Sequence, residues 1–320
     1  MSILVFLEHH GSELQKGALG VLTKASSLGD AEVAAVIVGA DAKALAPEAG
    51  KFGATKVFVA EDESVQQALP QSRVDVLAKL VTEHGYETVM LANSVLAADI
   101  ASGLAARLDA GLNWDLVDLE LQGDDLVGKR PALQDSVYVD VGWTSSPRLA
   151  LFRSGSFDPQ ESGGEAETHE VTAELRDFST RTKMLEQAHA EAEGKSIEDA
   201  DVIVAGGRGL GSPDNFTLAE DLAKALGGAV GATRAVVDAG WYPYSAQIGQ
   251  TGKTVSPKLY VALGISGAIQ HKVGMQGSGT IVAINKDANA PIFEFSDLGV
   301  VGDVHEIVPK LTELVQARRS

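Results

Sequence analysis

The chain has 320 residues, of which 45% are hydrophobic and 22% charged, and its formal net charge is −18. This length suits one large or two ordinary globular domains. A chain this acidic is repelled by nucleic-acid phosphates, so we expect no nucleic acid among its partners. The sequence contains no cysteine, which excludes disulfides, cysteine nucleophiles and Cys-ligated zinc or iron–sulfur centres.

The first residues give no sign of a targeting segment. Residues 1–8 lack both a basic region and a long apolar region, so we interpret them as the start of a strand and not as a signal peptide. No apolar run approaches the roughly 20 residues that a membrane-spanning helix needs. We therefore expect a cytoplasmic protein without membrane insertion.

Short apolar runs alternate with amphipathic stretches over the first half of the chain. The pattern predicts buried strands at 3–7, 32–38, 56–59 and 88–92, and helices at 13–28, 42–49, 65–83 and 97–108. Uninterrupted apolar strands between helices are typical of a parallel, doubly wound sheet. Four later strand-like segments are expected to extend this sheet in mixed or antiparallel fashion, at 115–121, 126–131, 136–141 and 148–153.

A polar, charged stretch at 184–197 separates a second region of alternating strands and helices. Strands are predicted there at 200–205, 259–263, 280–284 and 291–295, and helices at 214–226 and 304–317. The predicted fold class is therefore α/β, with two doubly wound Rossmann-like domains. We place the domains at 1–190 and 191–320.

Two glycine-rich loops of the second region resemble phosphate-binding motifs without matching them. Residues 206–212 follow a predicted strand, but Ser212 stands where the dinucleotide fingerprint requires its third glycine, so the loop is either a phosphate site or an ordinary turn. Residues 249–254 end in Gly-Lys-Thr, as a P-loop does. Gln247 stands where that motif requires its first glycine, which excludes a nucleoside triphosphatase.

Polar residues also follow the strands at 259–263 and 280–284. Ser266 could offer a hydroxyl to an anion, and His271 is either a structural residue or a functional one. Asn285 could bind a ribose or adenine edge, or cap a helix. No loop carries a nucleophile–base pair, paired carboxylates or a metal-ligand cluster. The residues thus favour a dinucleotide site without acid–base machinery, and we expect no bound metal.

Several segments match one known family. The sequence reads LYVALGISGAIQH at 259–271, followed by Gly274 and by IVAIN at 281–285. Upstream stand GGRG at 206–209, TRAVVDAG at 233–240 and QIGQTGK at 247–253; NKD and PIF follow at 285–287 and 291–293. This set resembles the α (large) subunit of electron-transfer flavoproteins. The resemblance is strong from about residue 200 onward, whereas over 1–190 only the order and length of the elements agree.

The resemblance implies a heterodimer with a smaller β subunit, in contact with the N-terminal domain. One FAD per heterodimer would lie in the C-terminal domain, with AMP in the β subunit, or a second FAD in a bifurcating version. The protein would be an electron carrier and not an enzyme. It would take electrons from dehydrogenases, typically of acyl-CoA type as in fatty acid β-oxidation, and pass them to a membrane quinone oxidoreductase.

The resemblance also implies the cofactor contacts, position by position. Arg234 would lie against the isoalloxazine ring, where a cation favours reduced, anionic flavin. Thr251 would donate a hydrogen bond to flavin N5, and His271, as a positive or hydrogen-bond-donating group, would lie near the C2 oxygen. The other expected contacts are Arg208, Thr233, Ile248, Gly249, Gln250, Ser266, Gly267, Ala268, Ile269 and Gln270, with Asn285 and Asp303 at the adenosine end.

Other interpretations of these residues stay open. Arg234 could form an ion pair with Asp238, four residues on. The aromatic residues Trp241, Tyr242 and Tyr244 favour core packing. Two other functions compete with an electron carrier: an oxidoreductase with its own small substrate, for which His271 is the sole acid–base candidate, and a non-redox nucleotide sensor.

Overall fold

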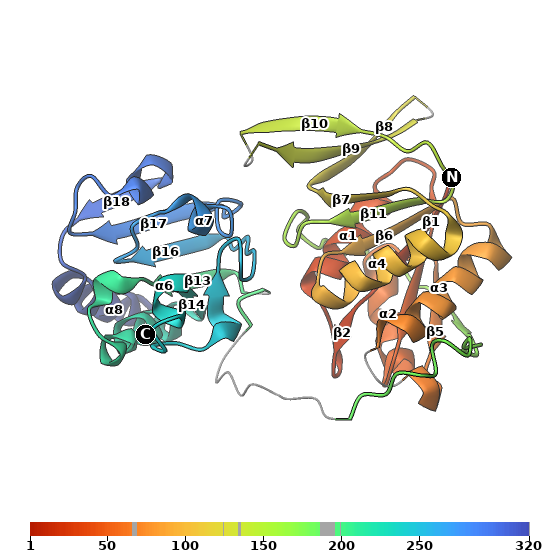
Figure 1. Ribbon diagram of the computed structural model, residues 1–320, viewed down its shortest axis with the longest axis horizontal. Helices are drawn as coiled ribbons and strands as arrows, with labels where there is room; N and C mark the ends of the chain where they lie inside the picture. Colours follow the sequence, from red (N-terminus) through yellow and green to blue (C-terminus); the bar gives the residue numbers. More distant parts are fainter. Residues whose placement is uncertain (66–68, 124, 134–135, 186–195, 199, 320) are drawn as a thin grey trace. The chain divides into compact units, whose positions relative to one another are not determined.

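The computed structural model describes residues 1–65, 69–123, 125–133, 136–185, 196–198 and 200–319. The chain folds as two compact units, Met1–Ala188 and His189–Ser320, each with its own parallel sheet (Figure 1). The boundary expected after residue 190 falls within 186–195, which lie outside the described residues.

The sheet of the first unit has seven strands, and all are parallel. Their spatial order is β12-β5-β4-β1-β6-β11-β7, so the chain changes direction across the sheet between β1 and β6. The strands are β1 (Ser2–Phe6), β4 (Glu32–Val38), β5 (Lys56–Ala60), β6 (Thr88–Ala92), β7 (Leu112–Leu116), β11 (Arg148–Phe152) and β12 (Glu167–Glu170).

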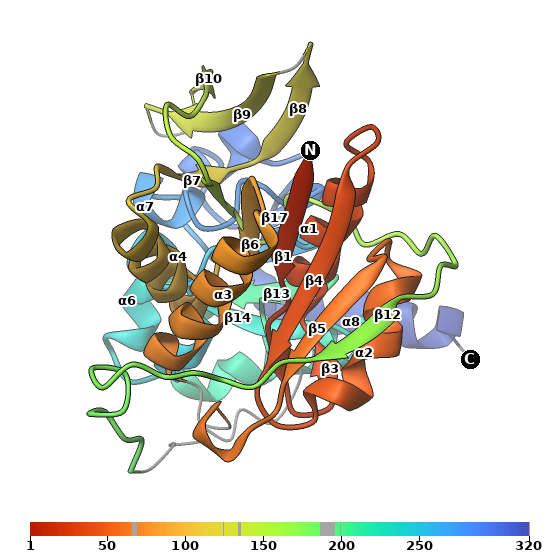
Figure 2. The same cartoon turned by 90° about the vertical axis from the view of Figure 1, so that its right-hand side faces the viewer.

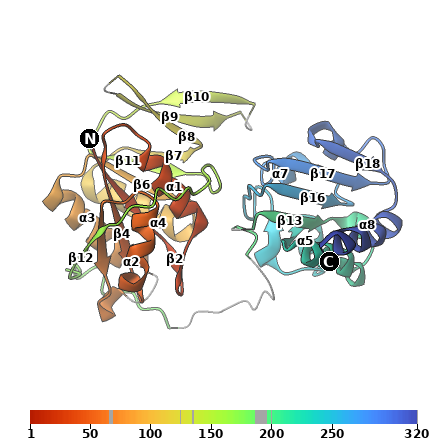
Figure 3. The same cartoon turned by 180° about the vertical axis from the view of Figure 1, so that it is seen from behind.

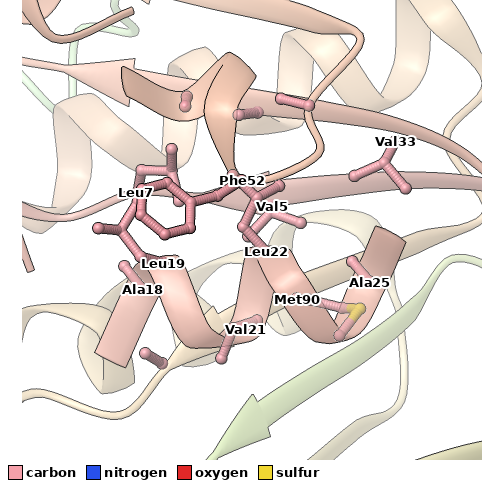
Figure 4. Close-up of a cluster of buried hydrophobic side chains, with 14 of the residues drawn as sticks. Val5, Leu7, Ala18, Leu19, Val21, Leu22, Ala25, Val33, Phe52 and Met90 are labelled. Carbon is pink, nitrogen blue, oxygen red and sulfur yellow. The ribbon is translucent and has the colours of Figure 1, made fainter. Parts of the chain in front are cut away.

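Helices cover both faces of this sheet, as the uninterrupted apolar strands require. One face packs against α1 (Lys16–Ser26) and α2 (Ala42–Lys51), and Figure 4 shows part of the resulting core, with Leu22 of α1 beside Val5 of β1. The other face packs against α3 (Pro70–His84) and α4 (Val95–Leu108), which lie side by side in Figure 2.

Local signals fix the ends of these helices. The Oγ of Ser94 accepts a hydrogen bond of 2.9 Å from the backbone N–H of Ala97 and so caps α4. Pro70 occupies the first turn of α3, where its missing N–H costs nothing, and Gly85 ends that helix at a φ of 69°.

Of the segments expected at 115–121, 126–131 and 136–141, only residues 115–116 extend the main sheet, as the end of β7. Contrary to expectation, these segments otherwise form a separate antiparallel sheet in the order β10-β9-β8, from β8 (Asp118–Gln122), β9 (Asp125–Ala132) and β10 (Val137–Val141). The segment at 148–153 does join the main sheet, but as the parallel strand β11. Sequence alternation identified strands here without stating which partner each would pair with. A short hairpin joins β2 (His9–His10) to β3 (Glu13–Leu14).

The second unit contains a six-stranded sheet, again all parallel. Its strands are β13 (Val202–Gly206), β14 (Ala229–Thr233), β15 (Gln247–Ile248), β16 (Leu259–Leu263), β17 (Thr280–Asn285) and β18 (Leu298–Val301). The spatial order is β15-β14-β13-β16-β17-β18. Numbered along the unit this order reads third, second, first, fourth, fifth, sixth, which is the dinucleotide-binding order with its switch point between β13 and β16.

The two faces of this sheet are covered differently. One packs against α5 (Thr217–Leu226) and α8 (Val304–Arg319), which lie beside each other in Figure 3, and against the short α6 (Arg234–Val237). The other is covered mainly by loops and α7 (Ile269–Lys272). Short 3₁₀ turns complete the two units: η1 (Glu63–Val65), η2 (Arg208–Leu210), η3 (Pro213–Phe216), η4 (Tyr244–Ala246) and η5 (Pro291–Phe295).

Several elements of this unit differ from the sequence expectation. The strand expected at 291–295 is the 3₁₀ helix η5, because Pro291 lacks an N–H for a sheet ladder and suits a helix start. Three strands were not predicted: β14, whose sequence AVGAT contains two alanines and a glycine, the two-residue β15, and β18, an edge strand with largely exposed side chains. All three complete the sheet order that defines the binding edge.

Candidate functional site

A cavity of about 670 Å³ lies in the second unit, at the carboxyl ends of the parallel strands. This edge of a doubly wound sheet is where ligands bind, because loops diverge there at the switch point. The volume lies within the range of roughly 300–1,000 Å³ that is usual for small-molecule sites. Loops that follow β13, β14, β15, β16 and β17 all contribute to its wall.

The cavity brings together most of the residues singled out in the sequence. Segments separated by up to about 80 residues converge here because their strands are parallel and end at one edge. The expected contacts that line the cavity are Arg208, Thr233, Arg234, Ile248, Gly249, Gln250, Thr251, Ser266, Ala268, Gln270, His271 and Asn285.

Three expected contacts are not among the lining residues. Gly267 has a φ of +86°, and a Cβ there would come within 2.3 Å of the backbone nitrogen of Ile292. Ile269 is 56% exposed. The carboxylate of Asp303 accepts a hydrogen bond of 2.9 Å from the backbone N–H of His305, at the start of α8. Cofactor contact stays a prediction for these three, as it does for the expected residues that line the cavity.

Nine further lining residues were not among the expected cofactor contacts. All except Ala290 lie within the motifs matched in the sequence, and Asp238 was considered there as an ion-pair partner of Arg234. These residues are Gly207, Gly209, Ala235, Asp238, Gly264, Ile265, Asp287, Ala290 and Pro291.

Glycines allow the loop after β13 and the loop after β16 to touch through their backbones. A Cβ on Gly207 would lie 2.5 Å from the carbonyl oxygen of Gly264, and a Cβ on Gly264 would lie 2.7 Å from the Cα of Gly209. Gly264 also adopts a φ of +60°, which other residues adopt only with strain. The loops after β13 and β16 therefore meet at the switch point, where a side chain would otherwise fill the space.

The cavity wall carries two arginines. Arg208 is exposed at the end of β13. The Nε of Arg234 donates a hydrogen bond of 3.1 Å to the Oδ2 of Asp238, and the two side chains are 64% and 61% exposed. The ion pair considered from the sequence is thus present, and Arg234 lines the cavity as well. An exposed pair of this kind is weak enough for Arg234 to exchange partners.

The loop after β15 is held by polar contacts. The Nε2 of Gln247 donates to the carbonyl oxygen of Thr251 at 3.0 Å and to its Oγ1 at 3.2 Å. The hydroxyl of Tyr244 donates to the same carbonyl oxygen at 2.9 Å. Tyr244 is 66% exposed, so its role is to hold this loop and not to pack in the core. Tyr242, by contrast, stacks on Phe216, with ring centroids 4.6 Å apart.

The sequence left His271 as either a structural or a functional residue, and the resemblance implied a positive or hydrogen-bond-donating group; its surroundings argue against the positive charge. Its side chain is buried, its Nδ1 lies 3.1 Å from the carbonyl oxygen of Ile248, and its Nε2 lies 2.9 Å from the hydroxyl of Tyr260. Burial lowers the pKa of His271 to about 4, although the bond to Ile248 acts in the opposite direction. The ring is therefore neutral near pH 7, and both of its nitrogens have partners within the protein.

Asn285 connects two lining segments. Its Nδ2 donates to the carbonyl oxygen of Ile265 at 2.9 Å, and its Oδ1 accepts from the backbone N–H of Asp287 at 3.0 Å. The side chain therefore connects the loops after β16 and β17. Its amide keeps one further N–H group and one further lone pair with which to bind another group.

The donor set fits a dinucleotide better than a metal or a hydrolytic substrate. Two arginines suit phosphate oxygens, and glycines allow a ligand to approach the backbone closely, while Thr251, Gln250 and apolar Ile248 suit a heterocycle. Within the described part of the chain, no group of three or more His, Asp or Glu residues is arranged to hold a metal ion. In the same residues, no helix is both long and apolar enough to span a bilayer.

A doubly wound sheet of this order, with a loop-lined cavity at its switch point, defines a dinucleotide-binding protein. Residues 3–176 match the family described as the electron transfer flavoprotein domain, and residues 196–276 match the electron transfer flavoprotein FAD-binding domain. The chain belongs to the electron transfer flavoprotein family, as an α subunit.

Curated relatives agree over nearly the whole length. The electron transfer flavoprotein subunit alpha of Mycobacterium leprae is 43% identical over 99% of this chain and 98% of its own. That of Mycobacterium tuberculosis is 43% identical over 99% of each. A probable mitochondrial electron transfer flavoprotein subunit alpha of Caenorhabditis elegans is 38% identical over 97% of this chain and 92% of its own. The family resemblance, the fold class and FAD as cofactor are thereby confirmed.

Proposed function

We propose that this chain holds one FAD in the cavity of its second unit and relays electrons without transforming a substrate of its own. One observation carries the proposal: a single cavity at the switch point gathers two arginines, a glycine-rich backbone and hydrogen-bonding side chains from five strand ends. When bound, the FAD supplies the redox chemistry, and the chain's residues bind it, orient it and set the local charge.

The lining residues support distinct roles toward that cofactor. Arg208 suits the pyrophosphate, since a guanidinium group binds anions. The N–H groups of Gly207 and Gly209 donate to the carbonyl oxygens of Leu263 and Gly264, so these two glycines bring the loops together and are not anion donors. Arg234 and Thr251 lie on the wall where the β14 and β15 loops meet and suit the flavin ring. Neutral His271 supports the wall rather than supplying a charge.

The partners follow from the family and stay proposals for this chain. We propose a heterodimer with a β subunit that holds AMP, donors that are acyl-CoA-type dehydrogenases of fatty acid β-oxidation, and a membrane quinone oxidoreductase as acceptor. The cytoplasmic location expected from the sequence likewise stays a prediction.

We also propose that the first unit provides the β-subunit contact, through β10. Val137, Tyr138 and Val139 of this edge strand are 42%, 60% and 40% exposed. An exposed apolar edge strand favours association with another chain. Val139→Lys should abolish co-purification with the β subunit, whereas Thr168→Lys on β12, an exposed edge strand of the main sheet, should not. Equal co-purification of both variants would contradict this contact.

Co-expression with the β subunit tests the main function. We expect a yellow heterodimer with one FAD, released by acid and quantified, whose flavin absorbance bleaches when acyl-CoA and an acyl-CoA dehydrogenase are added together. A colourless protein would favour the nucleotide sensor instead. Bleaching by a small substrate without any dehydrogenase would favour an enzyme.

A further inference from the structure

Tyr260 is a completely buried polar side chain to which the proposed function assigns no role. It is the second residue of β16, has no exposed surface and is among the largest fully buried side chains. Its neighbours in the core cluster are apolar, among them Ala205 and Met275. A hydroxyl in such surroundings costs free energy unless it makes a hydrogen bond. The structure gives it one partner, the Nε2 of His271 at 2.9 Å.

The direction of each hydrogen bond follows from the partners. The carbonyl oxygen of Ile248 can only accept, so the Nδ1 of His271, 3.1 Å away, carries a proton. Burial keeps the imidazole neutral, so Nε2 has no proton and accepts from the Tyr260 hydroxyl. Burial also raises the pKa of Tyr260, so that hydroxyl keeps its proton and donates it. The result is one directed chain, from Tyr260 through His271 to Ile248.

This chain joins two walls of the cavity. His271 lies on α7, directly after the β16 loop, and Ile248 ends β15, directly before the segment 249–251. The same two walls meet through backbone, since the N–H of Gln250 donates to the carbonyl oxygen of Gln270 at 2.8 Å. A Cβ on Gly249 would lie 2.8 Å from that oxygen, so the approach is close. Any rotation of the His271 ring therefore disturbs the segment that carries Gln250 and Thr251.

We propose that Tyr260 is a positioning residue, whose buried hydroxyl fixes the tautomer and orientation of His271. Through His271 it thereby fixes the position of the 249–251 segment against α7. Tyr260 is not among the residues that line the cavity. Its consequence for FAD retention rests on the proposed function, whereas its effect on the His271 ring does not.

Tyr260→Phe removes the hydroxyl and keeps the ring. The matched control is Tyr242→Phe, which also removes one hydroxyl from the second unit. The Tyr242 hydroxyl donates to Glu220 at 3.3 Å, and neither residue lines the cavity. Both variants are made in the full-length chain, co-expressed with the β subunit, and the histidine side chains are observed by isotope-labelled NMR. A His271→Asn spectrum assigns the His271 signals.

In the unsubstituted protein we expect a neutral His271 with its proton on Nδ1. Tyr260→Phe should produce a mixture of tautomers and weaken FAD retention about tenfold, the effect of one buried hydrogen bond. Tyr242→Phe should change neither the His271 tautomer nor FAD retention. In a His271→Asn background, Tyr260→Phe should change FAD retention less than twofold, because the two residues act through each other.

Two results would overturn the proposal. The first is a His271 that carries its proton on Nε2, or on both nitrogens, at pH 7 in the unsubstituted protein; this result needs no variant to fold. The second is a Tyr260→Phe variant with unchanged His271 signals and unchanged FAD affinity but a lower melting temperature, which would make Tyr260 a core residue only. A colourless unsubstituted protein would refute the FAD site, and the tautomer measurement would still decide the role of Tyr260.

Discussion

Arg234 and Asp238 lie one helical turn apart and share the cavity wall, with the guanidinium Nε 3.1 Å from the carboxylate Oδ2. The positive charge proposed to stabilise negative charge on the flavin is therefore partly balanced by a carboxylate in the same cavity. Because both side chains are largely exposed, water weakens this pairing, and each residue can be tested separately.

Arg234→Ala should lower the midpoint potential of the bound flavin. Removing a nearby cation costs about 1 kcal/mol of electrostatic stabilisation at an exposed site, equivalent to roughly 40 mV for one electron. A reductive titration against a reference dye measures the potential, and Arg234→Lys, which keeps the charge, should shift it less. An unchanged potential in the alanine variant would remove the assigned charge role.

Asp238→Asn should shift the potential in the opposite direction, upward by roughly 20–40 mV, because it removes a negative charge from the same wall. Since an exposed pair at this spacing contributes only about 0.3–0.5 kcal/mol, the melting temperature should change by less than about 3 °C. A downward shift would show that Asp238 acts mainly by holding Arg234 in place.

Gly264→Ala should prevent FAD binding, and Gly240→Ala is its matched control. Both glycines have positive φ, at +60° and +72°, but only Gly264 has backbone within 2.7 Å of a new Cβ, whereas Gly240 has nothing within 4 Å. Backbone strain alone costs about 1–2 kcal/mol, so both variants should unfold at a lower temperature. Flavin content, measured on the folded heterodimer, should fall in Gly264→Ala only. Loss of flavin from both variants would show that backbone strain, and not the close contact at Gly264, prevents binding.

His271 should make stability depend on pH. Its pKa is lowered to about 4 in the folded chain, whereas an unfolded histidine titrates near about 6.5. Between these values the unfolded state binds the extra proton, so stability rises with pH over this window and is complete above it. The contribution has an upper limit of about 3 kcal/mol.

Urea unfolding of the unsubstituted protein and of His271→Asn, at several pH values from 4.5 to 7, checks this. The free energy of unfolding of the unsubstituted protein minus that of His271→Asn should grow with pH. The effects of other titrating groups cancel in this difference because both proteins share them. Parallel curves would mean that His271 keeps an ordinary pKa in the folded chain.

The sequence by itself determined most of the local elements and the residues that could bind a cofactor. Strands such as β4 and β16 are continuous apolar runs, and their bounds follow from composition alone. The family motifs at 206–209, 233–240, 247–253, 259–271, 285–287 and 291–293 contain every residue of the cavity wall except Ala290, because loops that bind a common cofactor keep recognisable residues near its atoms.

Only the tertiary structure decided how these pieces combine. The pairing of β8, β9 and β10 into a separate sheet depends on partners far from each strand, which alternation does not encode. The neutral state of His271 depends on burial and on Tyr260 and Ile248, which lie 11 and 23 residues away along the chain. A pKa is set by the solvent and charges that surround a group in three dimensions, so the motif could name His271 but not its charge.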